Sequence, residues 1–192
     1  MGREFELKYA ANGSVLQALA ARYPQHRKIS METTYFDTPD GAFSAQHMTL
    51  RLRRENGTTV CTLKTPLADG SRGEWECFTD DIHTGIEILV SQGAPAGIKT
   101  LANSNLLMVC GARFTRLAID VPTLDGMAEL ALDKGVLLGG GREKPLCELE
   151  IELKSGSERA AVDLAAELAA AYDLQPEPKS KFRRAMDLAK GE

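Results

Sequence analysis

Charged and apolar residues alternate along much of this chain with a period of two, which is typical of β-strands that bury one face. In residues 4–8, Glu4, Glu6 and Lys8 share one face and the residues between them are apolar. A single strand of this kind needs only solvent on its polar face. We expect about eight strands, and six of them repeat the charged face: Glu4, Glu6 and Lys8; Arg51 and Arg53; Lys64; Arg72, Glu74 and Glu76; Glu129 and Asp133; Glu148, Glu150 and Glu152.

Capping and turn residues indicate where helices and loops separate these strands. Helices are expected at residues 14–23 with Ser14 as the cap, as short pieces between 80 and 107, at 157–172, and after Ser180. Gly135 and the glycines at 139–141 predict a flexible connection. They lack the spacing and the strand-to-helix context of a phosphate-binding loop.

The apolar faces of so many strands must be covered, and the amphipathic helices are the segments available to cover them. An antiparallel sheet of this size can curl and close, which places its charged face inside. We therefore predict an α+β fold, with an eight-stranded antiparallel β-barrel, a charged lumen and helices packed outside. Residues 1–192 are expected to form a single domain.

Composition narrows the classes of protein to consider. The chain has 192 residues, of which 43% are hydrophobic and 26% charged, as in ordinary globular domains. No apolar run approaches the length of about 20 residues that a membrane span needs, and the N-terminus is charged, so we expect a cytoplasmic protein without a membrane partner. The net charge of −4 argues against nucleic acid as a partner. The four cysteines lack paired spacing and are expected to be free thiols: Cys61, Cys77, Cys110 and Cys147.

The residue types in the predicted lumen indicate its ligand. Arginine and lysine side chains suit phosphate oxygens, because they donate charge-assisted and often bidentate hydrogen bonds. Carboxylates two residues apart, such as Glu150 and Glu152, suit a hard divalent cation such as Mg²⁺. Together they predict a site for a metal ion and a polyphosphate. The alternative is a solvated, salt-bridged sheet face without a ligand.

An ordered set of motifs extends from Glu4 to about Met186. With these motifs the chain resembles the CYTH superfamily of triphosphate tunnel metalloenzymes, and most of all its bacterial inorganic triphosphatases. The motifs are E-x-E-x-K at Glu4, Glu6 and Lys8; Y-F-D-T at 35–38; R-x-R at Arg51 and Arg53; Lys64; R-x-E at Arg72 and Glu74; Arg116; Asp133; E-x-E at Glu150 and Glu152; and Ser180-Lys181.

The resemblance implies a tunnel that holds a triphosphate and hydrolyses it with Mg²⁺ or Mn²⁺ as the cofactor. The substrate-binding residues it implies are Lys8, Arg51, Arg53, Lys64, Arg116 and Lys181, with Arg72 in a lesser role. The metal ligands it implies are Glu4, Glu6, Asp133, Glu150 and Glu152, and the catalytic residues Lys8, Lys64 and Glu150. Glu148 could replace one of the metal ligands, and Arg113 could replace Arg116.

Other functions within and beyond this family stay open. The resemblance also admits a thiamine triphosphatase or a class IV adenylyl cyclase, although no stretch reads as a nucleoside pocket. A polyphosphate-binding module without activity would keep the basic residues, and a purely structural barrel would bind no polyphosphate. The expected partner is a small-molecule triphosphate, with a homodimer as an open option. Members of this type often carry a C-terminal helical CHAD domain, and we expect none in this chain.

Overall fold

The computed structural model describes residues 2–3, 5–67, 72–103 and 105–192, with only the backbone described for residues 2–3. Its strands are β1 (Gly2–Arg3), β2 (Glu6–Ala10), β3 (Arg27–Asp37), β4 (Thr49–Glu55), β5 (Thr58–Pro66), β6 (Arg72–Phe78), β7 (Leu107–Pro122), β8 (Met127–Gly139), β9 (Arg142–Ser155) and β10 (Gln175–Pro176). Its helices are α1 (Gly13–Arg22), α2 (Ala42–Ala45), α3 (Ile82–Ser91), α4 (Gly97–Ala102), α5 (Glu158–Tyr172) and α6 (Lys181–Lys190).

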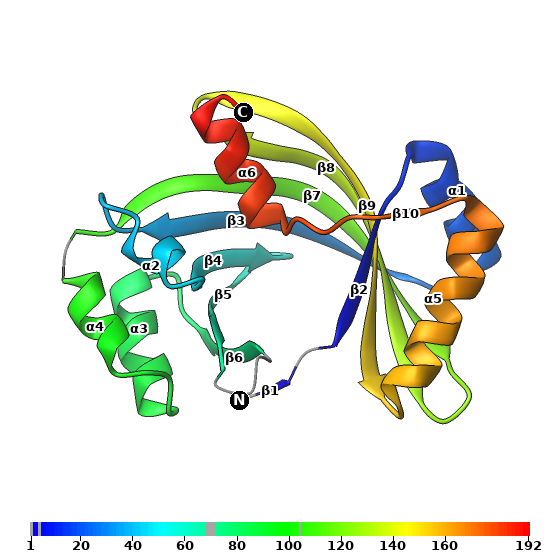
Figure 1. Ribbon diagram of the computed structural model, residues 1–192, viewed down its shortest axis with the longest axis horizontal. Coiled ribbons are helices and arrows are strands. Elements are labelled where there is room, and N and C mark those ends of the chain that lie inside the picture. The colour runs from blue at the N-terminus through cyan, green and yellow to red at the C-terminus, as the bar shows by residue number, and fades with distance from the viewer. Residues whose placement is uncertain (1, 4, 68–71, 104) are drawn as a thin grey trace.

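All strands described belong to one antiparallel sheet, in the order β1-β6-β5-β4-β3-β7-β8-β9-β2-β10. The N-terminal segment takes part at both ends of this order. Its Gly2 pairs with Glu74 on β6, and its Glu6 pairs with Glu152 on β9. The sheet therefore curls until one segment borders both of its sides (Figure 1). The predicted α+β class and the barrel-like antiparallel sheet are confirmed.

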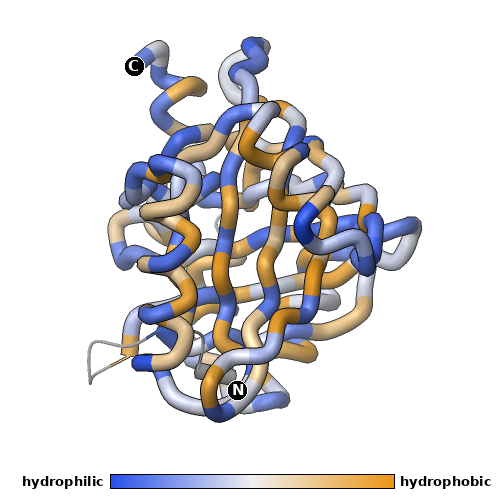
Figure 2. The backbone as a smooth tube through the Cα atoms, turned by 90° about the vertical axis from the view of Figure 1, so that its right-hand side faces the viewer, coloured by the Kyte–Doolittle hydropathy of each residue, from blue (hydrophilic) through white to orange (hydrophobic). Residues whose placement is uncertain are grey.

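Helices α3 and α4 cover the outer face of β4–β6, and α1 and α5 cover that of β8, β9 and β2 (Figure 1). Under the first pair, Leu50, Leu63 and Leu89 are completely buried. Each such leucine contributes about 1.5–3 kcal/mol from the apolar surface that it removes from water. The alternation of polar and apolar residues along the strands is visible in Figure 2. Beneath these two helix pairs, the strand pattern thus leads to apolar residues on the outer face of the sheet and charged residues on the inner face.

The cap of α1 differs from the sequence prediction by two residues. Asn12, rather than Ser14, is the N-cap, and its Oδ1 accepts a hydrogen bond of 2.9 Å from the amide of Val15. Ser14 lies within the first turn and donates its hydroxyl proton to the same oxygen. Asparagine is as good an N-cap as serine, so composition alone does not choose between the two. The caps predicted at Ser157 and Ser180 are confirmed.

Helix α6 differs from the expectation that helices pack outside the sheet. Its Ala185 packs in a cluster with Phe114 and Leu137, which share the strand face that carries Arg116 and Asp133. That face is the inner one, so α6 lies on the concave side of β7–β9 and occupies one end of the enclosed space (Figure 1). The buried alanine brings the helix close to the sheet.

The glycines near the β8–β9 turn explain this close approach and correct the prediction of a flexible connection. Gly135 is paired with Phe114 within β8, and Gly140 and Gly141 form a tight turn with positive φ angles of 57° and 74°. A Cβ at Gly139 would lie 2.3 Å from the carbonyl oxygen of Ala185. Glycine is needed here because the backbone of α6 rests directly on the hairpin.

None of the helices in the described ranges has the length and apolar character required to cross a membrane.

Candidate active site in the lumen

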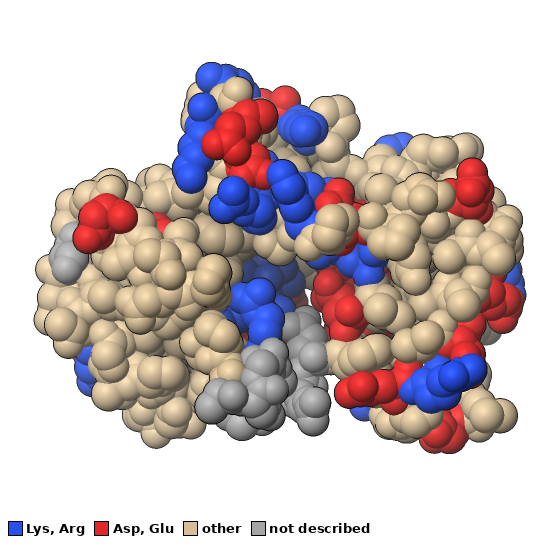
Figure 3. Space-filling view, in the orientation of Figure 1, with Lys and Arg blue, Asp and Glu red and all other residues tan. Residues whose placement is uncertain are grey.

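The curled sheet encloses a cavity of about 810 Å³ that opens to the surface. In Figure 3 it is the hollow at the centre of the molecule, with Lys and Arg on the side of β4 and β5 and beneath α6, and Asp and Glu on the opposite side. The predicted site residues that line it are Glu6, Lys8, Arg51, Arg53, Lys64, Arg72, Arg116, Glu150, Glu152 and Lys181. Among the predicted set, Glu4 lies outside the described residues, and Asp133 lies behind the cavity wall with no exposed surface.

Strand β4 places two arginines side by side in this cavity. Side chains alternate along β4, so Arg51 and Arg53 point inward while Leu50 and Leu52 point outward, as predicted. Arg53 is 9% exposed, and its Nε donates to the Thr33 hydroxyl at 3.2 Å. Burial, together with the charge of Arg51, lowers the pKa of Arg53 to about 10.

The positive charge of this pair is only loosely compensated. Arg51 Nη2 lies 3.7 Å from Glu74 and 3.9 Å from Glu76, beyond normal hydrogen-bond length. Its buried Nε has no hydrogen-bond partner within the part of the chain that the structure describes. Buried guanidinium groups without full compensation are energetically costly. The arrangement is therefore suited to a polyanion that supplies the missing acceptors.

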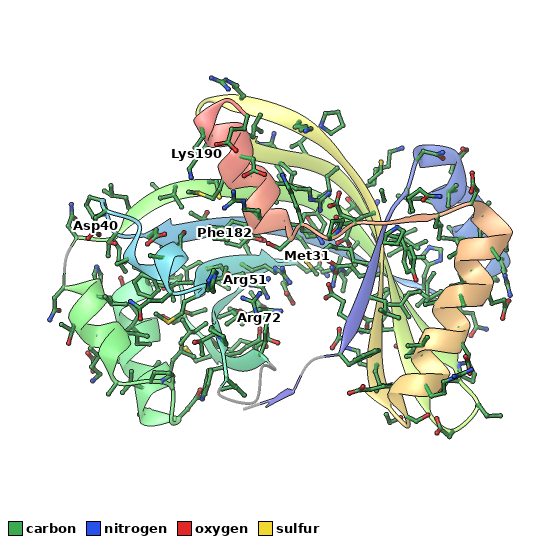
Figure 4. All side chains as sticks on the ribbon, viewed as in Figure 1. Met31, Asp40, Arg51, Arg72, Phe182 and Lys190 are labelled. Carbon is green, nitrogen blue, oxygen red and sulfur yellow. The ribbon has the colours of Figure 1, made fainter. Side chains whose placement is uncertain are left out.

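Lysines complete the basic wall on either side. Lys64 on β5 pairs with Glu74 at 3.3 Å, and Lys8 on β2 lies opposite Glu150 in the strand register. Arg72 lines the cavity from the start of β6, and its guanidinium reaches the carbonyl oxygen of His47 at 3.4 Å. Figure 4 shows Arg51 and Arg72 in the same enclosed space. Basic groups thus reach the cavity from several strands.

One end of the cavity is formed by a dense cluster of charges on β7, β8 and β9. Arg116 donates two hydrogen bonds of 2.8 Å to the two oxygens of Asp133 and also contacts Glu150. Burial would lower the pKa of Arg116, but the charges of Asp133 and Glu150 raise it well above its ordinary value. Arg116 therefore stays charged and can turn between its carboxylates and a ligand.

Lys181 enters the same cluster from the first turn of α6. Its Nζ lies 2.7 Å from Asp133 and 2.6 Å from Glu150, it contacts Glu148, and it lies 5.2 Å from the centre of the Phe114 ring. Burial would lower the pKa of Lys181, and the three carboxylates more than reverse this effect. The sequence did not show that the ammonium group is surrounded by carboxylates.

Three carboxylates on the neighbouring strands β2, β9 and β8 lie in a row across the acidic wall of the cavity. Glu6 on β2 is opposite Glu152 on β9, which is opposite Glu129 on β8. Like charges in directly opposed positions repel, so such a row requires cations. Arg27 contacts Glu129 at 2.8 Å and Lys154 contacts Glu152 at 2.8 Å. Sequence reasoning placed Glu129 on a charged face but missed it and Arg27 as site residues, because only the register brings them here.

The donor set fits a hard divalent cation. Glu6, Glu150 and Glu152 present carboxylate oxygens to the cavity, and Mg²⁺ and Mn²⁺ prefer oxygen ligands. Asp133, Glu148 and Glu150 also have oxygens that lie within 4.8 Å of one another. In this structure that second group surrounds the Lys181 ammonium. The role of Asp133 as a metal ligand stays a prediction.

The structure places Arg113 and Glu148, the two possible replacements that the sequence left open, in different surroundings. Arg113 lies on the outer strand face and pairs with Glu143 at 3.0 Å, where both side chains are exposed. Glu148 lies on the inner face but is fully buried and does not line the cavity. Arg116 is thus the β7 arginine of the lumen.

Two further sequence features have structural roles. Asp37 of the Y-F-D-T motif is 1% exposed and accepts hydrogen bonds from the amides of Thr38, Phe43 and Ser44, which secures α2 against β3. All four cysteines are free thiols, as predicted. Burial raises the pKa of Cys61 to about 12, so its thiol stays protonated.

Comparison with known proteins agrees with this geometry. Residues 2–186 match the CYTH domain family. The chain is 30% identical to the inorganic triphosphatase of Haemophilus influenzae, over 96% of this chain and 54% of that protein. The chain thus spans about half the length of this curated relative.

Solved structures share the fold along almost the whole chain. The PH1819 protein of Pyrococcus horikoshii OT3 has a TM-score of 0.66 at 22% identity, covering 96% of this chain and 99% of that one. HpAC1 from Hippeastrum, described as an adenylyl cyclase candidate with a dominant triphosphatase activity, has a TM-score of 0.64 at 18% identity, covering 98% and 96%. At these identities the likeness concerns the fold alone.

Proposed function

This chain belongs to the CYTH domain family, and from that membership and the geometry of the lumen we propose that it hydrolyses inorganic triphosphate to diphosphate and phosphate. The observation that carries the proposal is the pair Arg51 and Arg53, whose buried guanidinium groups face the cavity with only loose partners. A protein retains such a costly pair where a ligand completes it. A small, multiply charged anion without an organic group is sufficient to do so.

The basic residues would hold the phosphate chain along the cavity. Arg51 and Arg53 reach it from one wall and Lys64 from beside them, while Arg116 and Lys181 reach it from the closed end. A guanidinium group can donate two hydrogen bonds to phosphate oxygens, which aligns the triphosphate for in-line attack. The same cations would stabilise the charge that develops on the transferred phosphoryl group, so no covalent nucleophile is required.

The carboxylates of Glu6, Glu150 and Glu152 would hold Mg²⁺ or Mn²⁺. Such an ion supplies charge neutralisation and polarises a phosphoryl oxygen. Glu150 shares its oxygens with Arg116 and Lys181 in this structure. When a triphosphate attracts those two cations, the oxygens of Glu150 become available for the metal. Glu150 therefore couples the basic and the acidic halves of the site.

The relative from Haemophilus influenzae supports the choice among triphosphates. Its name gives inorganic triphosphate as the substrate, and 96% of this chain aligns with it. In the described part of this chain, the cavity lining combines charged side chains with a few apolar ones, including Ile29, Met31 and Phe182. The choice of inorganic triphosphate over a thiamine or nucleoside triphosphate therefore rests on this relative rather than on the size of the cavity.

The experiment is phosphate release from tripolyphosphate, ATP and thiamine triphosphate in parallel, each with Mg²⁺, Mn²⁺ or a chelator. We expect a strong preference for tripolyphosphate and complete loss of release with the chelator. Arg51→Gln should abolish release, whereas Arg54→Gln, one strand position from Arg53 and exposed, should leave it unchanged. Preference for ATP with formation of cyclic AMP would establish a cyclase instead, and binding without release would establish a binding module.

A further inference from the structure

We propose that Glu148 is a positioning residue, which holds Lys181 at the closed end of the lumen through ion pairs with the first turn of α6. The inference rests on the proposed function in one respect, namely that Lys181 contacts the bound triphosphate. Its structural part concerns only how β9 and α6 are joined. Glu148 itself does not face the cavity, so it acts through Lys181.

Glu148 contacts two cations on the same helix. Its Oε1 lies against the Lys181 ammonium, and its Oε2 accepts a hydrogen bond from Arg184. Lys181 and Arg184 are three residues apart and therefore project from the same face of α6. A carboxylate that binds both of them fixes the rotation of the helix as well as its distance from the strand.

The other two carboxylates around Lys181 have a different arrangement. Asp133 and Glu150 each contact Lys181, but both also contact Arg116 on β7. Among the described residues, Glu148 forms its ion pairs only with α6, although its carboxyl group also lies beside that of Glu150. Its side chain is fully buried, with 0% exposure, so it forms its ion pairs away from water. Of the three acids, Glu148 is therefore the one whose cationic partners all belong to α6.

The charges of this cluster explain why a dedicated acid is useful. Three cations and three carboxylates meet here: Arg116, Lys181 and Arg184, with Asp133, Glu148 and Glu150. An incoming polyphosphate competes with Glu150 for Arg116 and Lys181. Once Glu150 releases Lys181, the ammonium is still held by Glu148, together with Asp133. Lys181 can then add the phosphate to its partners without being drawn out of place.

Other contacts seat α6 without Glu148, so its replacement should leave the fold intact. The rings of Phe182 and Tyr35 pack with centroids 5.1 Å apart, and Figure 4 shows Phe182 at the first turn of α6, in the enclosed space where Met31 and Arg51 also lie. Ala185 packs on the Gly139 hairpin. Glutamine at position 148 has nearly the same volume and can still accept one hydrogen bond.

The test is a double-mutant cycle of Glu148→Gln and Lys181→Met, assayed by tripolyphosphate hydrolysis with Mg²⁺. Glu148→Gln should raise KM about tenfold and change kcat less than about threefold, since a buried charge pair is lost without touching the reacting atoms. The double variant should be no worse than Lys181→Met alone, because Glu148 acts through Lys181. Glu148→Asp, which retains the charge, should recover part of the affinity. Glu143→Gln, on the same strand but at the exposed Arg113 pair, should match the wild type.

Amide hydrogen exchange of residues 184–190, measured without substrate, checks the structural part separately. Glu148→Gln should raise the exchange of these amides more than that of the amides of β7 and β8, and Glu143→Gln should change neither. Unchanged exchange, or additive effects of the two variants on KM, would overturn the inference. If the wild type hydrolyses no tripolyphosphate, the proposed function fails, and the exchange measurement alone decides whether Glu148 holds α6.

Discussion

Replacement of Arg53 by glutamine should make the protein more stable and, at the same time, weaken its affinity for triphosphate. Arg53 is 9% exposed, and its partners among the described residues are the Thr33 hydroxyl, to which it donates at 3.2 Å, and Glu55, which lies 3.8 Å away. Glutamine can still donate to that hydroxyl group but carries no charge. The substitution therefore separates the cost of the buried charge from its use.

The size of the effect follows from the pKa of Arg53. Burial and the neighbouring charge of Arg51 lower this pKa from its ordinary value to about 10, so the folded state disfavours the charged form relative to the unfolded state. At pH 7 the arginine is charged in both states and the penalty is fully present; it begins to decline only as pH rises above about 10. A difference of about 2.5 in pKa corresponds to about 3 kcal/mol. Burial of the glutamine amide in place of the guanidinium group costs about 1 kcal/mol. The net gain in stability is therefore about 2 kcal/mol.

The assay is thermal unfolding at pH 7, with and without tripolyphosphate, in the presence of a chelator that prevents turnover. For a chain of this length, a gain of about 2 kcal/mol raises Tm by about 4–8 °C. Tripolyphosphate at a hundred times its Kd should stabilise the wild type by about 2.7 kcal/mol. In Arg53→Gln the same ligand concentration should stabilise by only about 0.3–1.3 kcal/mol, since lost charge-assisted hydrogen bonds weaken affinity by about 1.5–3 kcal/mol.

Arg54→Gln is the matched control, because Arg54 is exposed on the outer face of the same strand. It should change neither Tm nor the response to tripolyphosphate. A lower Tm for Arg53→Gln without ligand would show that the arginine is satisfied in the free protein. An undiminished ligand response would remove Arg53 from the binding site. Either result would refute the argument from uncompensated buried charge.

Three further outcomes are expected. Glu150→Gln should lower kcat/KM for tripolyphosphate roughly a hundredfold, because it removes the carboxylate that joins the cations to the metal; phosphate release measures this, and normal turnover would exclude Glu150 as a ligand. The Cys61 thiol, with its pKa raised to about 12 by burial, should resist iodoacetamide at pH 8 in the folded protein and react once unfolded, and its retained proton predicts stability that falls as pH rises above about 9. Leu89→Ala should cost about 3 kcal/mol of unfolding free energy in denaturant titrations, because Leu89 is 0% exposed on the buried face of α3; a loss below 1 kcal/mol would contradict its place in the core, and Val162→Ala, which is 41% exposed, serves as the control.

Much of the lumen was predictable because strand geometry is local. Arg51 and Arg53, or Glu150 and Glu152, must share a face of any strand that contains them, since side chains alternate strictly. The apolar residues between them had to be covered, which led to an inward charged face. These inferences need no knowledge of which strands are neighbours.

The charged rows across the strands could not be predicted in this way. Glu6, Glu152 and Glu129 are far apart in the sequence and meet only through the register of β2, β9 and β8. Arg116 was the predicted site residue with Arg113 as its possible substitute, and strand parity relative to Asp133 decided for Arg116. Register depends on pairing and burial over the whole sheet, so no single segment contains it.

The sequence by itself determined the alternating strands, the Ser157 and Ser180 caps, the free cysteines and the ordered motif residues, because each depends on neighbouring residues and their backbone geometry. Only the tertiary structure decided that α6 lies inside the sheet, with Lys181 among Asp133, Glu148 and Glu150. An amphipathic helix records that it has an apolar face, but not which surface will cover it. Here the glycines at 139 and 140 open the inner surface of the hairpin to the helix, and the buried carboxylates select the helix that carries the matching cations.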